Sequence, residues 1–208
     1  ADPSALLPWV VSPGTPRRAA RPRPLTEHRG HVSYELKAEL TQLRRSLLSM
    51  AAGVEKRVRI AMDALETLNP DVARQVRHGD SEIDSMEVDI EAERLRVLAL
   101  HAPVANDLRF VLAAIRVNGE LARIADLAKG VGKQVLQIAE HGRLPIPPSV
   151  GELSSLTRDL LADTLRALAE GDVDLAAKVR RDDARLDEQM KRVCDWADVH
   201  LEAHDYRA

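Results

Sequence analysis

The sequence has little of what secreted, membrane-spanning and zinc-ribbon proteins depend on. Its single cysteine, Cys194, cannot form an intrachain disulfide or a CxxC zinc site, which fits a reducing cytosol. No uninterrupted apolar run approaches the roughly 20 residues that cross a bilayer, so we do not expect direct insertion into a membrane. Aromatic residues make up only 2% of the chain. A core built from Leu, Ala, Val and Ile therefore favours helices over strands.

A large excess of positive charge is also missing. Lys and Arg total 30 against 33 Asp and Glu, a net charge of −3. No nucleic-acid partner is expected, because no positive field is available to neutralise phosphates. Residues 1–30 hold five of the arginines and six of the eleven prolines. We expect this Pro/Arg-rich arm to be disordered. It is either a basic arm that touches an anionic surface or upstream sequence that is not native to the protein.

From His31 onward, apolar residues recur at helical spacing between short breakers, which predicts an all-α fold of about five long helices. The breakers are Asn69-Pro70, His101-Ala102-Pro103, a proline-rich linker and Gly171-Asp172. Asp71 is expected to cap the second helix. The predicted helices cover residues 32–68, 71–100, 104–140, 150–170 and 174–203.

An internal repeat relates the two parts of the chain. A shift of 103 positions places DVARQVR, residues 71–77, on DLAAKVR, residues 174–180. The first repeat then contains three helices and the second contains two, so the second repeat is incomplete. We predict a disordered arm at 1–30, a three-helix repeat at 31–142, a linker at 143–149 and a truncated repeat at 150–208.

Acidic side chains interrupt the apolar faces of the predicted helices. At 100° per residue, Asp80, Asp84, Glu87 and Glu91 share one face of the second helix with Ala73 and Val76. On the third helix, Asp126 shares the face of Leu112, which we expect to be buried. Carboxylates that face a core need a compensating charge. That charge could be a cation, or arginines such as Arg94 and Arg123; the stripe could also lie in water.

The sequence contains no pattern typical of a catalytic site. It has no phosphate-binding glycine loop, no Gly-x-Ser-x-Gly elbow and no Glu-x-x-His pair. His101 and His141 stand at helix ends, where we expect caps and surface rather than ligands. Cys194 shares a face with Ala197 and is expected in the core. The sequence therefore does not predict an enzyme.

Two segments resemble a known family. PVANDLRF, residues 103–110, and ELARIADLA, residues 120–128, are similar to the P-x-A-x-D-L-R and E-L-E-R-I-G-D-x-A patterns of the PhoU family of bacterial phosphate-uptake regulators. The resemblance covers about residues 31–200 and implies two three-helix bundles. It also implies a cytoplasmic regulator that damps the phosphate-starvation response when phosphate is plentiful. The implied partners are the ATPase subunit of a phosphate ABC transporter and a phosphate-sensing histidine kinase.

The same resemblance implies a metal site. Some family members bind metal through Glu/Asp-x-x-x-Asp motifs on facing helices, which fall here on Glu87 with Glu91 and on Ala122 with Asp126. Ala122 stands where the family has Glu. The implied ligands of a divalent or iron cation are Asp84, Glu87, Glu91 and Asp126. A metal-binding helical bundle is the alternative function, and a structural bundle that pairs with another protein is a third.

The incomplete second repeat predicts an exposed apolar face on the last two helices. Such a face seldom survives uncovered on a soluble monomer. A second copy, a swapped helix or a partner protein is expected to cover it, and we expect a homodimer. The face was predicted to contain Leu160, Leu175, Val179, Leu186, Val193 and Leu201.

Overall fold

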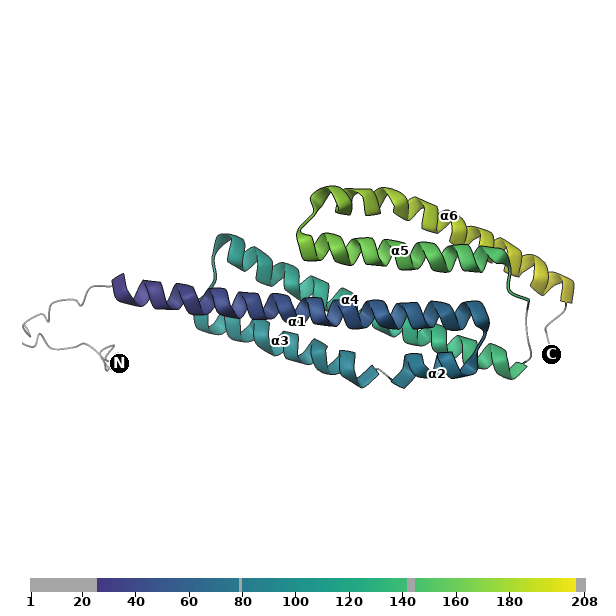
Figure 1. The fold of residues 1–208 in the computed structure, drawn as a ribbon, viewed down its shortest axis with the longest axis horizontal. Helices are drawn as coiled ribbons and strands as arrows, with labels where there is room; N and C mark the ends of the chain where they lie inside the picture. Colours follow the sequence, from purple (N-terminus) through teal and green to yellow (C-terminus); the bar gives the residue numbers. More distant parts are fainter. Residues whose placement is uncertain (1–25, 79, 142–144, 205–208) are drawn as a thin grey trace, which may run out of the picture.

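The computed structural model describes residues 26–78, 80–141 and 145–204, and side chains within 34–76, 81–140 and 145–200. All regular structure in these ranges is α-helical, which confirms the all-α prediction (Figure 1). The helices are α1 (Thr26–Thr67), α2 (Pro70–His78), α3 (Asp80–His101), α4 (Ala105–His141), α5 (Pro148–Glu170) and α6 (Val173–His204).

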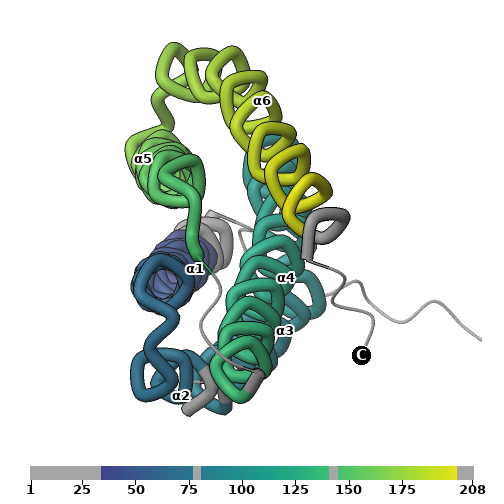
Figure 2. The backbone as a smooth tube through the Cα atoms, turned by 90° about the vertical axis from the view of Figure 1, so that its right-hand side faces the viewer, coloured from purple at the N-terminus to yellow at the C-terminus, as the bar shows by residue number. Residues whose placement is uncertain are grey.

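The helices run nearly parallel or antiparallel to one another, with the 42-residue α1 at the centre. Helix α1 packs against α2, α3, α4 and α5, whereas α6 packs against α5 alone among the described elements. Figure 2, viewed along the helices, shows α5 lying over α1 and α6 on the outside. Helix α1 is therefore shared by the first three-helix unit and the α5–α6 hairpin.

The core follows a seven-residue repeat typical of helical bundles. In α4 the buried positions alternate in steps of three and four from Val111 to Val135, and the single polar residue among them is Asn118. In α1 the same spacing runs from Leu43 to Ala64. Because α1 and α4 share this repeat, their buried faces stay in contact along most of their common length.

The predicted start of the first helix was too late. Helix α1 begins at Thr26 rather than Val32, so residues 26–30 belong to the helix and not to the arm. Between Pro24 and Pro70 the chain has no proline, so every backbone amide in that interval can donate within a helix. Residues 1–25 of the predicted arm lie outside the described residues.

The cap of the second predicted helix is also different from the prediction. Asn69 Oδ1 accepts a hydrogen bond from the Asp71 amide at 2.9 Å, and Pro70 is the first residue of α2. Asn69 rather than Asp71 is therefore the capping residue. Its side chain accepts from the amide of the second helical residue, and Pro70 at the first helical position has no amide hydrogen that needs a partner. The predicted single helix 71–100 is described as two, α2 and α3, on either side of residue 79.

The hairpin between α5 and α6 turns at the predicted break. Gly171 adopts a left-handed conformation with φ of 70°, and the Asp172 amide donates to the Ala167 carbonyl at 3.0 Å. Asp172 Oδ1 then accepts from the Leu175 amide at 2.9 Å and caps α6. A glycine that ends one helix and an aspartate that begins the next thus reverse the chain within two residues.

Two arginine contacts hold the hairpin on α1. Arg158, near the middle of α5, pairs with Asp63 and Glu66 of α1, each at 2.8 Å. At the C-terminal end of α5, the Ala169 carbonyl accepts a hydrogen bond from the guanidinium of Arg44 of α1 at 2.7 Å. These contacts join the two predicted repeats, whose boundaries stay a prediction.

Candidate functional site

The predicted acidic face of α3 lies at the edge of the bundle rather than inside it. Ile83, Ile90 and Val97 form the buried stripe of α3. Asp84 and Glu91 each follow a member of that stripe and are exposed, while Glu87 is partly buried. The expectation that these acids face the core was therefore wrong for Asp84 and Glu91.

The buried face of α4 also differs from the predicted one. Leu112 is 51% exposed and Asp126 is exposed, because the buried stripe passes through Val111 and Ala125 instead. The predicted stripe has the same alternation of three and four residues as the buried stripe, but it lies one position further along the chain. One position corresponds to about 100° around the helix axis. Spacing alone does not determine which of the two adjacent stripes faces the other helices.

The polar contacts around these acids come from the protein itself. Glu91 pairs with Arg94 at 2.7 Å, as the arginine interpretation anticipated. The buried Asn118 donates its side-chain amide to the Glu87 carbonyl at 3.1 Å and joins α4 to α3. Backbone and arginine contacts thus engage this face.

The family's implied ligand set does not fit the residues present. Ala122 offers no donor atom, and Asp126 lies on a different helix from the other three acids. Within the described residues, no group of three or more His, Cys, Asp or Glu side chains is placed to hold a metal ion. The four predicted ligands are therefore not brought together as one centre.

A histidine predicted at the surface is buried beside a glutamate. The His101 side chain is only 6% exposed, and its Nε2 lies 3.3 Å from Glu39 Oε2. The other oxygen of Glu39 pairs with Arg96 at 3.0 Å. This cluster joins the end of α3 to α1. No local sequence pattern predicts it, because Glu39 is more than 50 residues away from Arg96 and His101.

An apolar groove lies between α1, α4, α5 and α6, with a volume of about 310 Å³. Its floor is formed by Val58 and Met62 of α1 and by Ile124 and Val131 of α4. Helices α5 and α6 supply the opposite wall with Leu160, Val179 and Leu186. These three residues, like Leu175 and Val193, are partly buried rather than exposed as predicted, and the side chain of Leu201 lies outside the described residues.

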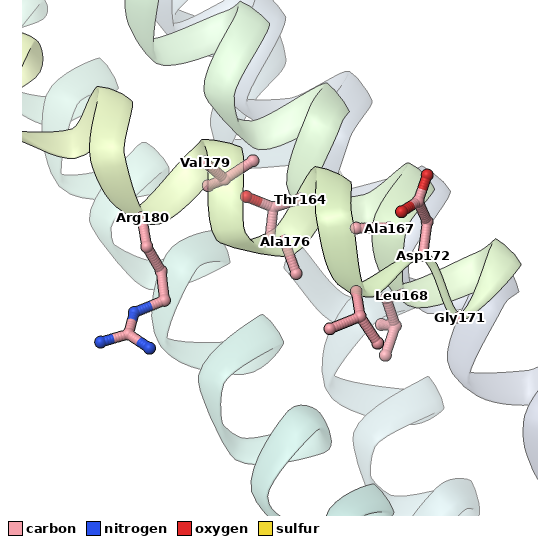
Figure 3. A pocket seen from close by; sticks show the side chains of 9 residues that line it. Thr164, Ala167, Leu168, Gly171, Asp172, Ala176, Val179 and Arg180 are labelled. Carbon is pink, nitrogen blue, oxygen red and sulfur yellow. The ribbon is translucent and has the colours of Figure 1, made fainter.

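A second hollow of about 510 Å³ continues along α5 and α6 toward their turn. Figure 3 shows Ala176 and Val179 of α6 beside Thr164 and Ala167 of α5, with Arg180 projecting away from α5. Apart from Arg180, Asp172 and Thr164, the lining is apolar or glycine. This surface is suited to contact with another apolar surface rather than to binding a charged small molecule.

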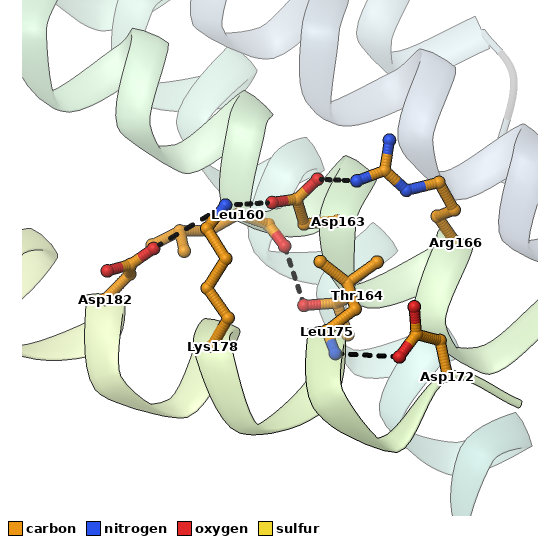
Figure 4. Close-up of polar contacts among 8 residues, drawn as sticks. All are labelled: Leu160, Asp163, Thr164, Arg166, Asp172, Leu175, Lys178 and Asp182. Atoms are coloured by element: carbon orange, nitrogen blue, oxygen red, sulfur yellow. Dashed lines mark hydrogen bonds and ion pairs between the residues drawn. The ribbon is translucent and has the colours of Figure 1, made fainter.

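Polar contacts fix α6 against α5 (Figure 4). Lys178 donates to Asp163 at 3.0 Å, and Arg166 pairs with the other oxygen of Asp163 at 2.9 Å. The Lys178 hydrogen bond lowers the pKa of Asp163, partial burial acts in the opposite direction, and attraction to Lys178 and Arg166 lowers it further. Asp163 is therefore ionised in neutral solution and holds the two helices together.

Cys194 does not lie in the core as predicted, because it is exposed. Among the helices that the structure describes, α6 packs against α5 alone. A helix that meets one partner buries one stripe, and Cys194 lies outside that stripe. The single cysteine is thus accessible to solvent.

The fold and the groove define a class: an all-α bundle of long helices with apolar hollows along α5 and α6. Residues 47–135 match the PhoU domain family. The chain is 33% identical over 171 residues to the phosphate-specific transport system accessory protein PhoU of Serratia marcescens, covering 82% of this chain and 70% of that protein. It is 35% identical over 162 residues to a Pseudomonas putida homologue, covering 77% and 63%.

Solved structures agree with these relatives. The crystal structure of PhoU from Pseudomonas aeruginosa superposes with a TM-score of 0.78 at 32% identity over 81% of both chains. The phosphate transport system regulatory protein PhoU from Streptococcus pneumoniae gives 0.74 at 25% identity, covering 81% of this chain and 80% of that one. This chain belongs to the PhoU family, and it spans about two thirds of the length of its curated relatives. Across the described ranges, none of the helices is long and apolar enough to cross a membrane.

Proposed function

We propose that this chain is a cytoplasmic, non-enzymatic regulator of phosphate uptake that restrains the phosphate-starvation response when phosphate is plentiful. It acts by contact with the ATPase subunit of a phosphate ABC transporter and with a phosphate-sensing histidine kinase. The observation that carries the proposal is the 33% identity, over most of the chain, to a protein named as a phosphate-specific transport accessory protein.

The surface chemistry supports an action through protein contact. The exposed hollows are lined mostly by aliphatic side chains, and the described residues contain no cluster of metal-ligand side chains. Apolar grooves between helices commonly receive a helix of a partner protein. A regulator that works by docking needs surfaces of this kind and no reacting groups.

Complementation tests this role. A Pseudomonas aeruginosa strain without its own PhoU would express the 208-residue chain, and alkaline phosphatase would be measured in phosphate-rich medium. We expect the chain to lower phosphatase expression toward the level of the parent strain. A matched control carries Leu43→Asp, which places a charge at a fully buried position and should prevent folding. Phosphatase that stays high with the wild-type chain, present at normal levels, would refute the proposal.

A further inference from the structure

The turn between α3 and α4 presents apolar side chains to solvent. Leu100, close to the end of α3, is 65% exposed, and Val104 in the turn is 73% exposed. Figure 1 shows this turn at one end of the first three-helix unit, where α1 runs beside it. Large aliphatic side chains at the tip of a helical hairpin contribute nothing to the core, so their exposure points to a contact with another molecule.

A tyrosine of α1 lies at the level of the same turn. Ser46 Oγ donates to Glu93 Oε1 at 2.9 Å, and seven residues earlier in α1 Glu39 lies beside His101. Helices α1 and α3 are therefore antiparallel. Five residues before Glu39, this register places Tyr34 level with the α3–α4 turn. Tyr34 is 78% exposed.

The backbone of the turn is held in one shape. Ala102 and Ala105 have φ of 41° and 49°, a left-handed conformation that residues other than glycine adopt only where their surroundings hold them in it. Pro103, between them, is buried and restricts the backbone further. The turn is thus a rigid feature, and a rigid surface loses little conformational freedom when it binds a partner.

This end of the hairpin is basic. Residues 94–116 contain four arginines and one acid, in a chain whose net charge is −3. Arg96 lies one helical turn before Leu100, and its side chain is 68% exposed although it pairs with Glu39. Arg109 is exposed and donates to Asn106 Oδ1 at 3.3 Å, and among the described side chains it has no carboxylate partner. An acidic surface is therefore the complementary partner.

The five exposed side chains at this end are named the turn patch: Tyr34, Arg96, Leu100, Val104 and Arg109. Their composition is typical of protein interfaces, in which tyrosine and arginine are enriched. Anionic membranes are recognised by clusters of about 4–8 Lys or Arg side chains. The turn patch has two arginines, and Asp107 lies between Val104 and Arg109. The observations thus favour a protein over a membrane.

We infer that the turn patch docks an acidic protein surface, in which apolar side chains receive Leu100 and Val104 and carboxylates pair with Arg96 and Arg109. The identity of this protein rests on the regulatory role proposed above. Because relatives of the chain are named as accessory proteins of a transport system, the partner is the ATPase subunit of the phosphate transporter rather than the kinase.

Binding measurements test the turn patch. The full chain would be immobilised, and the purified ATPase subunit of the Pseudomonas aeruginosa phosphate transporter would be the probe in biolayer interferometry. Leu100→Asp and Val104→Asp should each weaken binding by roughly tenfold or more, because each places a charge in the apolar contact. Arg109→Glu should also weaken binding and make it less sensitive to salt. Circular dichroism would confirm that each variant is folded.

The matched control is Leu127→Asp. Leu127 is 64% exposed, nearly as much as Leu100, and lies roughly 30 Å along α4 from the turn. This variant should bind the ATPase subunit as the wild-type chain does. A wild-type chain that does not bind the subunit, or turn variants that bind it as tightly as wild type, would overturn the inference.

Two further measurements separate the alternatives. Sedimentation with vesicles of phosphatidylglycerol and phosphatidylethanolamine would reveal a membrane role, and vesicle binding that Leu100→Asp abolishes would overturn protein docking. The phosphatase test distinguishes this inference from the regulatory role. Repression of phosphatase without binding through the turn would remove only the docking surface. Binding through the turn without repression would support the docking surface and remove the regulatory role.

Discussion

At the scale of single residues, Gly132 determines how closely α4 approaches α2. A Cβ atom at this position would lie 3.1 Å from Val76 Cβ and 3.2 Å from the Ala73 carbonyl oxygen. The oxygen belongs to a helix backbone and cannot move aside as a side-chain tip can. The small residue therefore allows the close contact that buries Ala73 and Val76.

Gly132→Ala is expected to lower the free energy of unfolding by roughly 1–2 kcal/mol, because overpacking outweighs the gain in helix propensity. Gly130→Ala is the matched control, since nothing lies within 4 Å of its Cβ position. That variant should be stabilised by up to about 1 kcal/mol. Urea unfolding of the three proteins checks both signs, and equal stabilisation of both variants would contradict the close contact.

Residue patterns predicted the composition of the acidic face but not its burial. The sequence showed that Asp84, Glu87 and Glu91 share one side of a helix, which is correct. Whether that side or the adjacent one faces the core depends on the neighbouring helices, which local spacing does not specify. Local spacing also could not predict contacts between distant segments, such as the contact of His101 with Glu39.

At the scale of helices, Asp163 is the main polar link between α5 and α6. Its folded-state pKa is lowered, first by the hydrogen bond from Lys178. An aspartate with a lowered pKa stabilises the fold above its unfolded pKa, and this contribution is lost as the pH falls through the folded value. The α5–α6 pairing should therefore weaken in acid below about pH 4.

We expect wild-type protein to lose protection of the α6 amides in that acidic range, and Asp163→Asn to show a weaker pH dependence. Hydrogen exchange followed by mass spectrometry at several pH values measures it, after correction for intrinsic rates. The control is Asp159→Asn, which changes an exposed aspartate on the same helix. Identical pH profiles for Asp163→Asn and wild type would exclude the link.

Apolar spacing and helix breakers correctly predicted where helices form. They predicted the first and last residues of the helices less accurately. Proline and glycine correctly predicted the turns at Asn69-Pro70 and Gly171. Proline narrows the allowed backbone angles and glycine widens them, whatever the surrounding structure. The start of α1 was misplaced because charged and polar residues at 26–31 are compatible with both helix and coil. Gly30 also stands in this segment and lowers its helix propensity.

At the scale of the whole molecule, Arg158 joins the α5–α6 hairpin to the first bundle. It pairs with Asp63 and Glu66 of α1, and its side chain is 29% exposed. Arg158→Ala should lower the free energy of unfolding by about 1 kcal/mol, because two partly shielded pairs are lost. Arg166→Ala, which removes a more exposed pair within α5, should cost less than about 0.5 kcal/mol. Thermal denaturation with a hydrogen-exchange map of the hairpin would show whether the first variant alone loosens it.

The central position of α1 has a consequence for synthesis on the ribosome. Helix α1 is made first, yet its buried stripe is completed only by α4, whose last residue follows Thr67 by more than 70 positions. At about 5–20 residues per second, the interval between the two is roughly 4–15 s. During that time the 42-residue α1 exposes the part of its apolar stripe that α4 will cover. The newborn protein should therefore bind chaperones at α1 until translation reaches the end of α4.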